Sequence, residues 1–144
     1  QRGYHSTAVL LPDGRVLYGG GNHEPNNPRL SDYQIYRPEY MEATRPNITF
    51  APPVINYGQQ FAVNFTFSGG LSFVERVVLI RPGSTTHHFD SEQRYLLLDR
   101  VSSTGNTLNV VAPPSRDFAP AGYYMMVVLT NGRVPSEARW VRLQ

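Results

Sequence analysis

Short apolar runs follow one another along this 144-residue chain, separated by Pro, Gly, Asn and Ser. The runs are rich in β-branched and aromatic side chains, and none of them shows a sustained helical period. This pattern predicts an all-β protein. The segments expected to form strands are residues 6–11, 16–21, 32–38, 60–67, 74–82, 95–103, 107–114, 122–131 and 138–143.

The first two of these segments are joined by the sequence PDGR. Pro12 presets a turn, and Gly14 supplies the positive φ that a bulged type I turn needs. We therefore expect a tight hairpin whose mouth carries Tyr4 and His5. Near the other end of the chain, the dipeptide Asn131-Gly132 predicts a second hairpin turn.

The composition changes at residues 42–58, "EATRPNITFAPPVINYG", which is typical of a linker. The apolar runs after it have about the spacing that the two sheets of an Ig-like sandwich require. The three strands before it cannot bury both faces of a sheet by themselves, whereas a β-propeller blade has a neighbour on either side. We therefore predict a boundary near residue 43, with blade-like strands in 1–43 and a β-sandwich in 44–144.

Composition excludes several classes of function. The chain has neither cysteine nor lysine, so disulfides, thiolate metal sites and Schiff-base chemistry on this chain are excluded. The net charge of +2 comes from scattered arginines rather than a basic stripe, so no nucleic-acid partner is expected. The longest strongly apolar run, 123–129, is far shorter than the roughly 20 residues of a membrane span. Because Gln1 is not an initiator methionine and no leader precedes the first strand, we expect a fragment of a longer or processed protein.

Four separated stretches carry more specific motifs. They are "RGYHSTAVLLPDGRVLYGGGN", "YQIYRPEYM", "LIRPGSTTHHFDSEQRYLLL" and "PAGYYMMVVLTNGRVPSEA". In this order, and over nearly the whole chain, they resemble the copper radical oxidases, the family of galactose oxidase and glyoxal oxidase. The resemblance implies that 1–43 is part of the last blade of a seven-bladed kelch-type propeller plus a linker. It also implies that 44–144 is an Ig-like, early-set β-sandwich.

The resemblance further implies a ligand set for one copper ion. Tyr4 corresponds to the axial ligand, and His5 and His87 correspond to the two equatorial imidazoles. The family's remaining ligand is a tyrosine cross-linked to a cysteine, which would lie in the propeller upstream of this chain. We therefore expect the upstream propeller to be a partner of this chain, and the chain alone to be inactive.

The residues themselves support these ligands only under one geometric condition. Two imidazoles and a phenolic oxygen form an N,O ligand set that suits Cu(II). Successive side chains of a regular strand point to opposite faces, so Tyr4 and His5 share an ion only where the backbone is irregular. The alternative interpretation is an aromatic and a polar residue at a strand edge. The same alternation predicts that only one of His87 and His88 faces the metal. The resemblance favours His87, so we expect His88 in a solvent-facing or supporting position.

The activity implied by the resemblance is that of a secreted oxidase. It would convert a small primary alcohol or an aldehyde hydrate to its two-electron oxidation product and reduce O₂ to hydrogen peroxide. Tyr4 would take the proton of the substrate hydroxyl. Two alternatives stay open: a noncatalytic sandwich with a structural or carbohydrate-binding role, and a propeller protein that binds a partner without redox chemistry.

Other stretches have plainer interpretations. His23 lies in a polar loop and is expected at the surface. The glycines at 19–21 are followed by neither a lysine nor a helix, so they indicate close packing of a blade rather than a phosphate site. The run at 122–129 is interpreted as a core strand rather than as a sugar platform. Asn47 and Asn64 begin glycosylation sequons, which matter only in a secreted eukaryotic protein.

Overall fold

The computed structural model describes residues 3–21, 32–70, 73–87 and 89–144. These residues form strands joined by turns and by one short 3-10 helix, η1, at Glu39–Glu42. The strands are β1 Ser6–Leu10, β2 Val16–Gly20, β3 Tyr33–Tyr36, β4 Asn47–Phe50, β5 Val54–Ile55, β6 Gln60–Thr66, β7 Val74–Arg81, β8 Thr85–Thr86, β9 Phe89–Asp90, β10 Arg94–Leu97, β11 Asp99–Thr104, β12 Thr107–Val111, β13 Gly122–Thr130 and β14 Arg139–Leu143. The predicted all-β class is confirmed.

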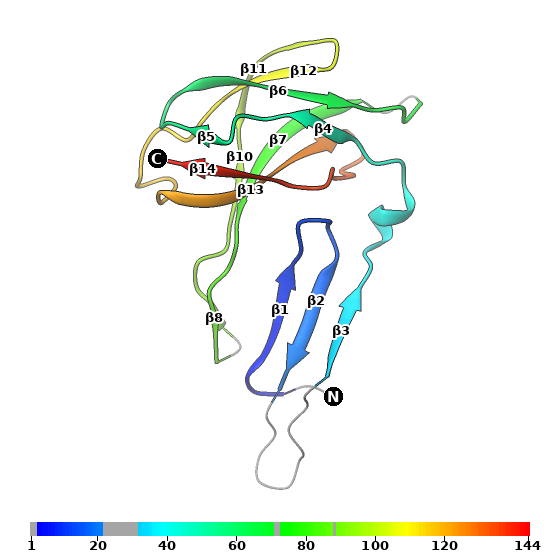
Figure 1. The fold of residues 1–144 in the computed structure, drawn as a ribbon, viewed down its shortest axis with the longest axis vertical. Helices are drawn as coiled ribbons and strands as arrows, with labels where there is room; N and C mark the ends of the chain where they lie inside the picture. The colour runs from blue at the N-terminus through cyan, green and yellow to red at the C-terminus, as the bar shows by residue number, and fades with distance from the viewer. Residues whose placement is uncertain (1–2, 22–31, 71–72, 88) are drawn as a thin grey trace, which may run out of the picture.

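Two packed sheets form a β-sandwich in the C-terminal part of the chain (Figure 1). One sheet has the strand order β10-β7-β13-β14-β5 and the other has the order β11-β12-β6-β4. Strand β6 shows why the sequence folds in this way. Its residues Phe61, Val63 and Phe65 are buried, while the residues between them are more exposed, as expected for a strand with one face on a core.

Strand β13 lies in the middle of the five-stranded sheet and is buried on both faces. Tyr124, Met126 and Val128 belong to the core between the two sheets. The Tyr124 hydroxyl donates to the Pro120 carbonyl oxygen at 2.7 Å, so this buried phenol has a hydrogen-bond partner. The interpretation of 122–129 as a core strand is therefore confirmed.

The N-terminal strands form a separate sheet with the order β1-β2-β3. Figure 1 shows this sheet standing apart from the sandwich, with the β1–β2 turn directed toward it. Gly14 has φ +94°, and the Leu11 amide donates to the Arg15 carbonyl oxygen at 2.8 Å, so the expected hairpin turn is present. Whether these strands belong to a propeller blade, and whether a domain boundary falls near residue 43, stay predictions.

The predicted strand at 95–103 is wrong as a single element. Strand β10 ends at Leu97 in one sheet, and β11 begins at Asp99 in the other. Leu98, between them, is buried in the core, and its amide donates to the Val77 carbonyl oxygen at 3.0 Å. The chain therefore crosses from one sheet to the other without interrupting its apolar pattern, and that pattern alone does not reveal the crossing.

The predicted linker at 42–58 is also partly wrong, because it contains two strands of the sandwich. β4 pairs with β6, and β5 pairs in parallel with β14. Ile48 and Ile55 are both fully buried in the core. These strands are short and surrounded by prolines, so only their pairing with distant strands distinguishes them from a linker.

Candidate metal centre

Tyr4 and His5 occupy the two central positions of a turn directly before β1. The Ser6 amide closes this turn by donating to the Gly3 carbonyl oxygen at 3.1 Å. His5 has φ +63°, and a positive φ at the third residue is what a type II turn requires. Tyr4 and His5 can face one ion only where the backbone departs from a regular strand, and this turn provides that departure. The two ring centres lie 4.1 Å apart.

Gly20 provides the space for this turn. It pairs with Ser6 across the hairpin and has φ +68°, a conformation that favours glycine. A Cβ atom at this position would lie 2.8 Å from the His5 carbonyl oxygen. Glycine at position 20 therefore allows a close approach to the backbone of a candidate ligand within the hairpin, while the packing of a blade stays a prediction.

His87 comes from the long connection between β7 and β10, which contains the small β8–β9 hairpin. Figure 1 shows β8 far from the sandwich, at the level of the β1 end that begins with Ser6. His87 also has a positive φ, +51°. The Thr86 hydroxyl oxygen lies 2.7 Å from the His87 Nδ1 atom, which leaves Nε2 as the ring nitrogen for a metal.

Asp90 stabilises the loop that carries His87. Its Oδ1 atom accepts hydrogen bonds from the amides of Ser84 and Glu92, at 3.1 and 3.4 Å. A Cβ atom on Gly83 would lie 1.9 Å from the Asp90 Oδ2 atom, so glycine at 83 leaves room for this carboxylate. At the base of the loop, Arg81 Nη2 donates to the Glu92 carboxylate at 2.9 Å. His87 is therefore held by a loop with its own polar framework.

The three candidate rings converge although they come from distant parts of the sequence. The ring centres of His5 and His87 lie 5.0 Å apart, and those of Tyr4 and His87 lie 5.9 Å apart. With a metal–nitrogen bond of about 2.0–2.1 Å, the centres of two imidazoles on one ion lie about 4.5–6.5 Å apart, for angles from 90° upward. The separation of His5 and His87 falls in this range, so the two rings fit one shared ion.

The donor set also fits copper better than a carboxylate-binding metal. Among the described residues, no group of three or more His, Cys, Asp or Glu side chains could hold a metal ion. The candidate third donor beside the two imidazoles is the phenol of Tyr4, whose ring lies near both, and an N,N,O set of this kind suits Cu(II). All three residues are exposed, Tyr4 to 48%, so one side of the site is open in this chain.

Residues 45–143 match the family described as "Galactose oxidase-like, Early set domain". The chain belongs to this family. The predicted relationship to galactose oxidase and glyoxal oxidase is thus confirmed.

Several relatives of this galactose oxidase-like chain are oxidases by name. It is 38% identical over 160 residues to "Aldehyde oxidase GLOX" of Vitis pseudoreticulata, covering 99% of this chain and 30% of that protein. It is 32% identical over 153 residues to "Galactose oxidase" of Gibberella zeae, covering 99% of this chain and 21% of that protein. A solved fungal alcohol oxidase of the AA5 family, in complex with copper, has a TM-score of 0.83 and 27% identity, with coverage of 99% of this chain and 31% of that one. The chain thus spans less than a third of these relatives.

Sequence reasoning identified the three converging residues of this galactose oxidase-like chain but not the residues around them. His88 and His23 lie outside the described residues. Asp90 was missed, although Asp next to turn residues is known to bond the nearby backbone, as it does here. Thr86 was also missed, and its contact is with the imidazole of the next residue rather than with the backbone. The ligand roles of Tyr4, His5 and His87 themselves stay a prediction.

Proposed function

We propose that this chain is the C-terminal part of a copper-dependent oxidase. The enzyme would oxidise a primary alcohol or an aldehyde hydrate to its two-electron product and reduce O₂ to hydrogen peroxide. The observation that carries the proposal is the convergence of Tyr4, His5 and His87, with His5 and His87 ring centres 5.0 Å apart. The names of three relatives, an aldehyde oxidase, a galactose oxidase and an alcohol oxidase, support the same class of reaction.

In this proposal His5 and His87 hold one copper ion through ring nitrogens, and Tyr4 holds it through its phenolic oxygen. Bound copper supplies a Lewis acid for the substrate hydroxyl and a one-electron redox partner. The Tyr4 oxygen, as a phenolate, would accept the proton of the substrate hydroxyl, which its exposed position allows. Thr86 holds the Nδ1 atom of His87 and so keeps the ring orientation fixed. In the overall reaction the substrate loses two electrons and two protons, and O₂ gains both as hydrogen peroxide.

The chain would not perform this reaction alone. It has no cysteine, so a cross-linked tyrosine–cysteine cofactor has to come from another part of the protein. We propose that this part is an upstream propeller whose last blade includes β1, β2 and β3. The exposed side chains of β3, Tyr33, Ile35 and Tyr36, support this partner, because apolar sheet faces are normally covered.

We also propose that the enzyme is secreted. Among the described residues no helix combines the length and the apolar character that a membrane crossing needs. Asn47 is exposed, whereas Asn64 is half-buried and its Oδ1 atom accepts a hydrogen bond from Thr107. A glycan on a eukaryotic secreted protein is therefore expected first at Asn47, and a mass shift after glycosidase treatment, abolished by Asn47→Gln, tests this expectation.

The proposed function is tested on the full-length protein. Copper analysis should give one ion per chain, and a peroxide assay with primary alcohols and aldehydes should detect turnover. His87→Ala should cost far more copper affinity than the neighbouring substitution His88→Ala, because only one of the pair is predicted to face the site. Equal losses would contradict the ligand assignment. Absence of copper and of peroxide would favour the noncatalytic structural or carbohydrate-binding alternative.

A further inference from the structure

A group of hydrogen bonds to main-chain carbonyls ties the β1–β2 turn to the connection between β13 and β14. Arg45 lies at its centre. Its Nη1 atom donates to the Asp13 carbonyl oxygen at 2.7 Å, while Nε and Nη2 donate to the carbonyl oxygens of Pro135 and Ser136 at 2.8 and 2.9 Å. Because the guanidinium is a rigid planar fork, these three bonds fix the turn relative to the sandwich. We call this arrangement the Arg45 clamp.

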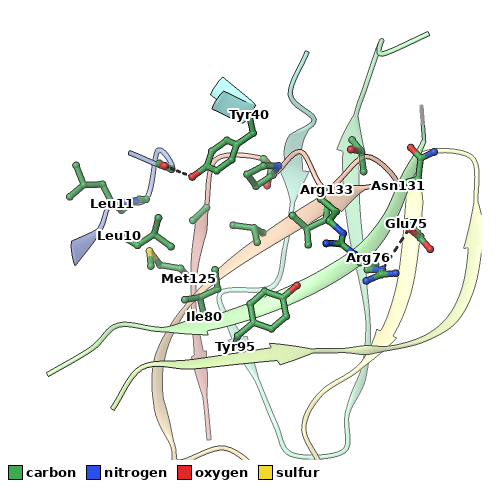
Figure 2. Close-up of a pocket in the computed structure, with 18 residues that line it drawn as sticks. Leu10, Leu11, Tyr40, Glu75, Arg76, Ile80, Tyr95, Met125, Asn131 and Arg133 are labelled. Atoms are coloured by element: carbon green, nitrogen blue, oxygen red, sulfur yellow. Dashed lines mark hydrogen bonds and ion pairs between the residues drawn. The ribbon is translucent and has the colours of Figure 1, made fainter. Parts of the chain in front are cut away.

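Two neighbouring bonds strengthen the Arg45 clamp. The Tyr40 hydroxyl donates to the Gly14 carbonyl oxygen, and Figure 2 shows it pointing at the turn. Burial raises the pKa of Tyr40, which keeps its hydroxyl protonated as a donor at neutral pH. The Ala138 amide donates to the Pro12 carbonyl oxygen at 2.8 Å. The turn is therefore held both by η1, which contains Tyr40, and by the sandwich.

Side-chain packing between the hairpin and the sheet is incomplete beside the clamp. Next to the clamp lies a cavity of about 460 Å³, with Leu10 and Leu11 on the hairpin side and Ile80 and Met125 on the sheet side (Figure 2). A cavity of this size means that the apolar surfaces of the hairpin and the sheet are not fully packed against each other here. Within the described residues, the polar clamp is thus a principal restraint on the orientation of the hairpin.

The hairpin connects the clamp to the candidate metal centre. Tyr4 and His5 precede β1, and the clamped turn follows it, so the two lie at opposite ends of the strand. Five strand residues span about 17 Å, so a tilt of about 10° at the clamped end moves the other end by about 3 Å. Metal–ligand distances tolerate only about 0.2 Å. His87 belongs to the sandwich rather than to the hairpin, because its loop extends from β7, which pairs with β13.

From this geometry we infer that Arg45 is a positioning residue of the metal centre. It keeps Tyr4 and His5, the candidate ligands next to the hairpin, correctly placed relative to His87 of the sandwich. The inference rests on the proposed copper site. Arg45 lies far from the ion in this arrangement and acts only through the hairpin. Its loss changes the position of Tyr4 and His5 without removing a donor atom.

The test compares Arg45→Met with Arg139→Met in the full-length protein. Among the described residues the Arg139 guanidinium donates one hydrogen bond, from Nη2 to the Ile48 carbonyl oxygen at 3.2 Å within the sandwich, and Arg139 serves as the matched control. Copper affinity is measured by chelator competition, and hydrogen exchange of the Ala138 and Ser6 amides is measured without metal. Arg45→Met should weaken copper binding by about 10–100-fold, as loss of a supporting partner typically does, and should speed exchange at both amides. Arg139→Met should change neither, and Arg45→Lys should not restore affinity because one ammonium cannot replace the fork.

The outcomes separate the inference from the proposed function. If wild-type protein binds no copper, the proposed function fails, and the Ser6 exchange rate still decides whether Arg45 orders the turn of Tyr4 and His5. If copper binds and Arg45→Met leaves its affinity unchanged, the positioning inference is overturned, whether or not Ala138 exchanges faster. Equal losses of affinity in Arg45→Met and Arg139→Met would also overturn it, since they would indicate a general loss of stability.

Discussion

The sandwich and the β1–β2–β3 sheet bury their side chains in opposite ways. The core of the sandwich joins residues from both of its sheets, from Ile48 to Leu143. In the described part of the N-terminal sheet, no large apolar side chain is buried, and Ile35 of β3 is 42% exposed. The sandwich thus contains the hydrophobic burial that folding needs, whereas the N-terminal sheet depends on contacts from outside itself. The candidate metal centre uses both regions, so its geometry depends on the less self-sufficient one.

The largest expected effect comes from separating the two regions. Residues 44–144 expressed alone should melt cooperatively, because the sandwich core lies within them. Residues 1–43 alone should stay unfolded, because two or three strands without a covered face are marginal in water. Calorimetry of the first and the dispersion of amide NMR signals of the second measure this. A folded, dispersed spectrum for 1–43 would contradict both the comparison and the blade interpretation.

The second-largest effect concerns Tyr4, which lies beside the N-terminal sheet and is proposed to act in the reaction. Tyr4→Phe in the full-length protein keeps the ring but removes the oxygen that is proposed to accept the substrate proton. Turnover should fall about 10²–10⁴-fold, the usual contribution of a general base, while copper stays bound through His5, His87 and the remaining ligand. Peroxide production and copper content are measured on the same sample. Undiminished turnover would exclude Tyr4 as the base, and loss of copper would make it chiefly a structural ligand.

Truncating an apolar side chain should cost more stability in the sandwich than in the N-terminal sheet. Leu79 is fully buried in the sandwich, so Leu79→Ala should lower the free energy of unfolding of 44–144 by about 2–5 kcal/mol. Ile35→Ala on β3 should cost the 1–144 chain about 1 kcal/mol or less, because little of its surface is buried there. Denaturant unfolding measures both. If Ile35→Ala matched Leu79→Ala in cost, the N-terminal sheet would contain a core of its own.

The smallest effect is a pH dependence at the contact between the regions. The hydrogen bond from the Arg15 amide lowers the pKa of Asp13, which also accepts from Arg15 Nε at 2.7 Å. A lowered carboxyl pKa stabilises the fold at neutral pH, and this contribution disappears as the pH falls through the lowered value. Asp13→Asn should therefore cost below about 1 kcal/mol at neutral pH and nothing in strong acid, since the pair is partly exposed. Melting temperatures of the full-length protein from neutral to acidic pH measure this, and an equal cost at every pH would contradict it.

Much of the fold could be predicted because its signals are local. The apolar and polar alternation of β6 and the turn residue Gly14 act on the backbone directly around them, so they are readable in the sequence. The sheet change at Leu98 and the strands β4 and β5 were not predicted. Their backbone hydrogen bonds go to strands distant in sequence, and no local pattern names the partner.

The candidate metal centre divides in the same way. The sequence, through its resemblance to the copper radical oxidases, indicated Tyr4, His5 and His87 as candidate ligands. The alternation of side chains along a strand required an irregular backbone at Tyr4 and His5 if both were to face one ion. Only the tertiary structure decided that these rings meet, because two turns with positive φ at histidines, far apart in the sequence, lie side by side in the folded chain. The bonds of the Arg45 clamp to Pro135 and Ser136 likewise join residues 90 and 91 positions apart, and they are maintained by long-range packing. Such packing is a property of the folded chain as a whole, so no short stretch of sequence encodes it.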